Sequence, residues 1–136
     1  MTDVNIWVVL IGGLSAVVIG FVWYAPAVFG TVWMRLANVR AEDIEAGKQR
    51  MPLLALAGFA AAVVLSWVFA QFAVVWESFT LGSALELGFW IWLGFMVPIL
   101  IGPFLWEQKS AKFVAINAAY WLVTTLVVAT IVSLWG

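Results

Sequence analysis

The chain has 136 residues, of which 66% are hydrophobic and 10% are charged, and its formal net charge is −1. An ordinary soluble domain is about 45–50% apolar and about 25% charged, so this composition excludes a water-soluble fold and indicates an integral membrane protein. The small net charge gives no sign of a nucleic-acid partner. Because the chain contains no His and no Cys, it lacks the usual ligands of zinc, haem and iron–sulfur clusters, and we predict neither a metal nor a cofactor.

The first predicted membrane helix covers residues 4–24. Its N-terminal tail carries Asp3 and no basic residue, and the apolar run is longer than the about 7–15 residues of a signal peptide, so we expect a retained helix. Pro26 lacks an N–H group and crowds the turn before it. We therefore predict a kink there, followed by a segment over residues 27–36 that lies along the membrane surface.

Three further apolar runs follow a polar loop at residues 35–50. They cover residues 52–75, 84–105 and 111–135, and each has the about 20 residues that a helix needs to cross a bilayer. Four crossings place both termini on the same side of the membrane. The sequence thus predicts one transmembrane domain, an all-α four-helix bundle with a kinked first helix that leads into an interfacial segment.

The basic residues give the orientation. All six Lys and Arg residues fall within residues 35–50 and 109–112, and none lies in either tail or between the second and third spans. Short loops rich in Lys and Arg stay in the cytoplasm. We therefore expect both termini outside, in a multi-pass protein of the bacterial inner (cytoplasmic) membrane. The ten Trp residues lie mostly near the ends of the spans, as in an aromatic belt at the headgroups.

Small residues recur every four positions in the first two spans. Since lipid tails are as apolar as Leu side chains, membrane helices associate where small residues let their backbones approach. The pattern predicts a close hairpin between the two spans. The small residues concerned are Gly12, Ala16 and Gly20 in the first span, and Gly58, Ala62, Ser66 and Ala70 in the second.

Polar residues inside the membrane are costly and therefore mark candidate functional positions. Glu86 is the candidate intramembrane acid, although Ser83 to Glu86 also fits a capping box that begins a helix. Asn117, Tyr120 and Thr124 share one face of the fourth span. This face could line a polar path, or it could form hydrogen bonds between helices.

Two segments carry a resemblance to a known family. Residues 20–34 read GFVWYAPAVFGTVWM, and residues 104–122 read FLWEQKSAKFVAINAAYWL. Over nearly the whole chain, the sequence resembles the small four-span bacterial and fungal membrane proteins grouped as domain of unknown function 1761. The resemblance implies this architecture and assigns no activity. Its motif residues here are Trp23, Tyr24, Pro26, Phe29, Gly30 and Trp33 in the first segment, and Glu107, Ser110, Lys112, Asn117 and Tyr120 in the second.

Both segments lie at the inner membrane boundary, where we predict a polar and aromatic site. No Ser has a His to activate it and no phosphate-binding loop is present, so we do not expect an enzyme. One hypothesis is an oligomeric or accessory subunit whose inner rim binds lipid, through self-association or within a larger membrane complex. The alternative is a small-solute or ion permease that uses Glu86 and the Asn117 face. The expected site combines Tyr24, Trp33, Glu107, Lys109, Asn117 and Tyr120.

Overall fold

The computed structural model describes residues 3–136, except for the side chain of Ala41, and within them the chain is helical with no strand. Four stretches are long and apolar enough to cross a membrane, which confirms the predicted all-α membrane bundle. The third is assembled from four consecutive helical pieces. The elements are α1 (Ile6–Trp23), the π-helix η1 (Pro26–Gly30), α2 (Thr31–Ala37), α3 (Ala41–Gly47), the short 3-10 helix η2 (Lys48–Arg50), α4 (Met51–Val75), α5 (Leu81–Ile91), the π-helix η3 (Trp92–Met96), α6 (Val97–Leu100), α7 (Gly102–Trp106) and α8 (Ala111–Trp135).

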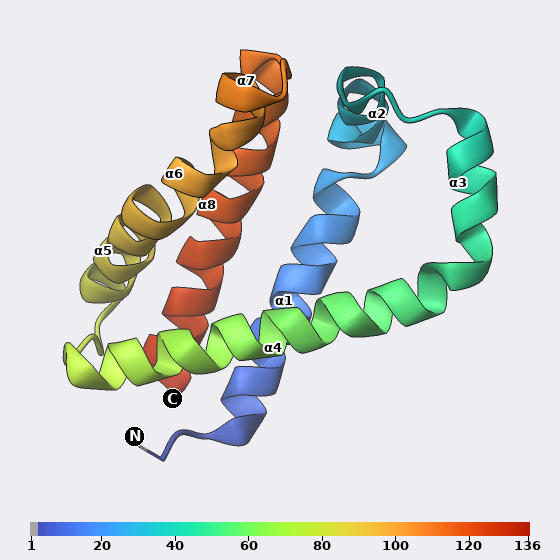
Figure 1. The fold of residues 1–136 in the computed structure, drawn as a ribbon. Helices are drawn as coiled ribbons and strands as arrows, with labels where there is room; N and C mark the ends of the chain where they lie inside the picture. Colours follow the sequence, from blue (N-terminus) through green and yellow to red (C-terminus); the bar gives the residue numbers. More distant parts are fainter. Residues whose placement is uncertain (1–2) are drawn as a thin grey trace.

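The two termini lie at the same end of the bundle (Figure 1). The opposite end, which we call the basic end, carries α2, α7 and the beginning of α8. Helix α8 packs against α1, α4 and α5. Helix α3 stands apart from the other helices, and α4 runs from it steeply across α1 (Figure 1). The expectation that the basic end faces the cytoplasm stays a prediction.

The first span breaks at the predicted place. Helix α1 ends at Trp23, and Ala25 takes an extended conformation (ψ 145°), as the residue before a proline prefers. The chain then re-enters a helix at Pro26. Gly30 closes this turn, because a Cβ at its position would collide with the backbone carbonyl of Tyr24. The turn therefore explains why a glycine stands at this motif position.

The predicted hairpin between the first two spans is close over only part of its length. A Cβ on Gly12 would strike the hydroxyl of Ser66, and one on Gly13 would lie 3.0 Å from the backbone nitrogen of Val63. Around Gly58, by contrast, no described residue outside the adjoining turns of α4 lies within 4 Å of such an atom. The two helices touch at the glycine pair and diverge toward the beginning of α4.

The capping box predicted at Glu86 was wrong. Helix α5 begins at Leu81, and its cap is Thr80, whose hydroxyl accepts from the Ser83 backbone N–H (3.2 Å) while the Ser83 hydroxyl accepts from the Thr80 N–H (3.0 Å). This reciprocal pair satisfies the free N–H groups at the helix start. Glu86 lies further along α5, and its side chain is exposed and does not face the bundle interior.

Candidate functional site

An aromatic cluster joins α2 and α8 to the end of α1. The ring of Tyr24 lies 5.6 Å from the Trp33 ring and 5.4 Å from the Tyr120 ring, measured between centroids. Trp33 also stacks on Phe113 at 6.0 Å. Tilted and offset contacts of this kind each contribute about 0.5–1.5 kcal/mol beyond the burial of area. The cluster fixes the position of α2 over the bundle.

Hydrogen bonds between α1 and α8 accompany the aromatic contacts. The Tyr24 hydroxyl donates to Asn117 Oδ1 at 2.6 Å, and the Trp23 indole N–H donates to the carbonyl of Ile116 at 3.1 Å. On the same side of α8, the Tyr120 hydroxyl donates to the carbonyl of Ala16 at 3.1 Å. These bonds tie α8 to the last two turns of α1 and to the residue after it.

The polar face predicted on α8 therefore meets α1. Asn117 and Tyr120 both bond to the first span or its cap residue, and Thr124 is fully buried. Of the two interpretations left open by the sequence, hydrogen bonding between helices describes what Asn117 and Tyr120 do in this structure. Such bonds stabilise membrane helices by roughly 0.6 kcal/mol each, with a maximum near 1.7.

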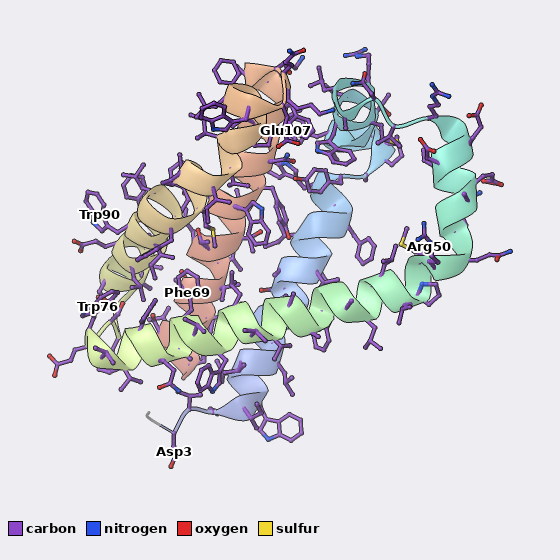
Figure 2. All side chains as sticks on the ribbon, in the orientation of Figure 1. Asp3, Arg50, Phe69, Trp76, Trp90 and Glu107 are labelled. Carbon is purple, nitrogen blue, oxygen red and sulfur yellow. The ribbon has the colours of Figure 1, made fainter. Side chains whose placement is uncertain are left out.

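The turn between α7 and α8 contributes one of its two predicted site residues. The Lys109 ammonium donates to the carbonyl of Ala37 at 3.2 Å and lies 5.7 Å from the centre of the Phe113 ring. It thereby holds the end of α2, where a cation suits the helix dipole. The side chain of Glu107 is exposed at the end of α7 (Figure 2) and makes no hydrogen bond or ion pair with the described residues.

Two further motif positions, Pro26 and Gly30, form the turn after α1. Pro26 is exposed at its start, and the buried Gly30 closes it. The indole nitrogen of Trp33 is buried and has no hydrogen-bond partner among the described residues. Buried polar atoms are usually satisfied by protein, water or a ligand, so this N–H group is a donor that remains available within the cluster.

A groove beside this cluster was not predicted from the sequence. It has a volume of ≈ 650 Å³ and lies between α1, the first half of α4, and α8. Tyr24 and Tyr120 border it with their rings, and Gly58 lies on the opposite wall. The other lining residues are apolar: Ala16, Val17, Gly20, Phe21, Met51, Leu54, Ala55, Ala61, Ala62, Leu65 and Trp121.

One signal in the sequence could have indicated this groove. The small-residue series of α4 continues from Ser66 back to Gly58, whereas the series of α1 stops at Gly20 and is followed by Phe21 and Tyr24. Two helices cannot approach closely where one presents large rings. The divergence of α1 and α4 follows from this mismatch.

Comparison with known proteins identifies a family for this chain but assigns no activity to it. Residues 7–133 match the family described as Protein of unknown function (DUF1761). No curated protein and no solved structure matches the chain. The match covers all four spans, the turn after α1 and the hydrogen-bonded face of α8. The chain therefore belongs to this family of proteins of unknown function.

Proposed function

We propose that this protein is a non-enzymatic membrane subunit that holds a lipid chain in the groove between α1, α4 and α8. The observation that carries the proposal is the groove itself. Its volume of ≈ 650 Å³ lies within the about 300–1,000 Å³ of ligand sites. Among its lining side chains, the hydroxyls of Tyr24 and Tyr120 already donate their hydrogens within the protein, and Trp121 adds one indole N–H to an otherwise apolar wall. The walls therefore suit an apolar occupant.

The length of the groove suits a hydrocarbon chain. The α4 wall runs from Met51 to Leu65, about 21 Å at a rise of about 1.5 Å per residue. An extended acyl chain can follow a largely apolar wall of this length.

Assembly is the second part of the proposal. Gly82 and Gly94 belong to the third span and are exposed, and beyond the adjoining helix no residue of the described chain lies within 4 Å of where a Cβ would stand. Small residues on an outer helix face allow another helix to approach closely in a membrane. The outer surface of the third span at either of these glycines is suited to contact a second copy of the chain or another membrane subunit.

Native mass spectrometry of the protein extracted in mild detergent tests both parts. We expect the wild type to carry bound lipid and to be present as an oligomer or with a partner subunit. Gly58→Leu places a side chain in the groove and should remove the lipid. Gly102→Leu is the matched control, since nothing in the described part of the chain lies within 4 Å of a Cβ at Gly102 and this glycine lies outside both the groove and the glycines proposed for assembly, and it should retain the lipid.

Two results of this experiment would contradict the proposal. A wild type that appears as a lipid-free monomer without a partner would refute the proposal. Equal loss of lipid from Gly58→Leu and Gly102→Leu would show that the groove does not hold it.

A further inference from the structure

We propose that the lipid in this groove is an anionic phospholipid whose phosphate group binds Arg50. This inference rests on the proposed function and adds the headgroup class. Arg50 is the residue directly before Met51, which lines the groove where α4 begins. Figure 2 shows Arg50 at this junction of α3 and α4. A phospholipid with its acyl chain between α1 and α4 would bring its headgroup to this position.

The charge of Arg50 is uncompensated in the described part of the chain. Its side chain is exposed and forms no ion pair. The neighbouring Lys48, by contrast, is paired with Glu45 at 2.6 Å, with both side chains exposed. The carboxylate of Asp43 accepts from the backbone N–H of Arg40 at the start of α3. Glu42, the remaining acid of this segment, is exposed in that first turn, at the far end of α3 from Arg50.

The chemistry of the guanidinium group selects the ligand. Arginine presents a planar set of N–H donors that matches phosphate oxygens in pairs. A zwitterionic lipid offers the same phosphate together with an ammonium group, which opposes a second positive charge nearby. A lipid with net negative charge therefore gains more from Arg50. Basic residues near an anionic headgroup contribute about 1 kcal/mol each, which corresponds to a preference of about fivefold.

The position of the groove also explains why the preference for anionic lipid should depend on Arg50 in particular. Arg35 is also exposed and forms no ion pair with the residues that the structure describes, but it belongs to α2, and no residue of α2 lines the groove. A headgroup attached to a chain in the groove would therefore be next to Arg50 and not next to Arg35. This gives a control of the same residue type.

The test is native mass spectrometry after exchange with equal amounts of phosphatidylglycerol and phosphatidylethanolamine of identical acyl composition. We expect the wild type and Arg35→Gln to retain the anionic lipid in about fivefold excess. Arg50→Gln should retain both lipids about equally, because the acyl groove is intact. Arg50→Lys should keep part of the preference, since it preserves the charge and loses the paired geometry.

Each contrary outcome has a separate meaning. Equal retention of the two lipids by the wild type, or a preference that Arg50→Gln does not change, would overturn the headgroup assignment while leaving the lipid groove in place. An equal loss of preference in Arg35→Gln would likewise overturn it, because a diffuse basic surface would then account for the effect. A wild type that retains neither lipid would refute the proposed function as well.

Discussion

The side chain of Tyr24 connects three parts of this protein. Its hydroxyl bonds to α8, its ring contacts Trp33 of α2, and the same ring borders the groove. The sequence predicted that these aromatic and amide side chains gather at one membrane boundary, because such side chains prefer that depth. It did not predict which atom bonds to which, since Tyr24 and Asn117 are 93 residues apart in the chain.

A double-mutant cycle measures the bond between these two residues. Tyr24→Phe and Asn117→Ala should show a coupling of about 0.6 kcal/mol, up to about 1.7, in the free energy of unfolding. The measurement is reversible unfolding in mixed micelles. Tyr24→Phe combined with Thr130→Val should be additive, because the Thr130 hydroxyl bonds to the carbonyl of Leu126 within α8. A coupling near zero for the first pair would contradict the assigned hydrogen bond.

At the scale of elements, the crossing of α1 and α4 is the central feature. Small residues predicted that these helices pair, and Gly12 and Gly13 do allow the contact. The prediction failed for the other end of the pattern, where Gly58 faces the groove. Spacing alone does not reveal which small residues of a series contact the partner helix, because that depends on the size of the partner's side chains at the same depth.

Two alanine substitutions separate the close part of the crossing from the open part. Gly13→Ala would place a Cβ 2.7 Å from Val63 Cγ2 and 3.0 Å from the Val63 nitrogen, so the helices must move apart. We expect the free energy of unfolding to fall by about 1–3 kcal/mol, as for other overpacked contacts. Gly58→Ala meets no neighbour and should leave stability unchanged or slightly higher. Similar losses in both variants would contradict the described crossing.

For the whole molecule, the two termini share one end and α2 and α7 share the other (Figure 1). The positive-inside rule assigns the basic segments to the cytoplasm. Because the chain contains no Cys, single cysteines can report the orientation without background labelling.

The exposed residues Asp3 and Gln49 are suitable positions for this measurement. In intact cells, a membrane-impermeant maleimide should label Asp3→Cys, and it should label Gln49→Cys only after lysis. The cysteine-free wild type should stay unlabelled in both conditions. The reverse pattern, or equal labelling of both variants in intact cells, would refute the predicted orientation.

The sequence by itself determined the four membrane-spanning segments and the break before Pro26. Hydropathy and the geometry of proline act locally, and a bilayer requires each spanning backbone to satisfy its own hydrogen bonds. Only the tertiary structure decided that Glu86 is exposed and that α1 and α4 diverge into a groove. Lipid provides no hydrophobic force that pairs particular helices. The arrangement therefore depends on which small residues meet which side chains across the bundle.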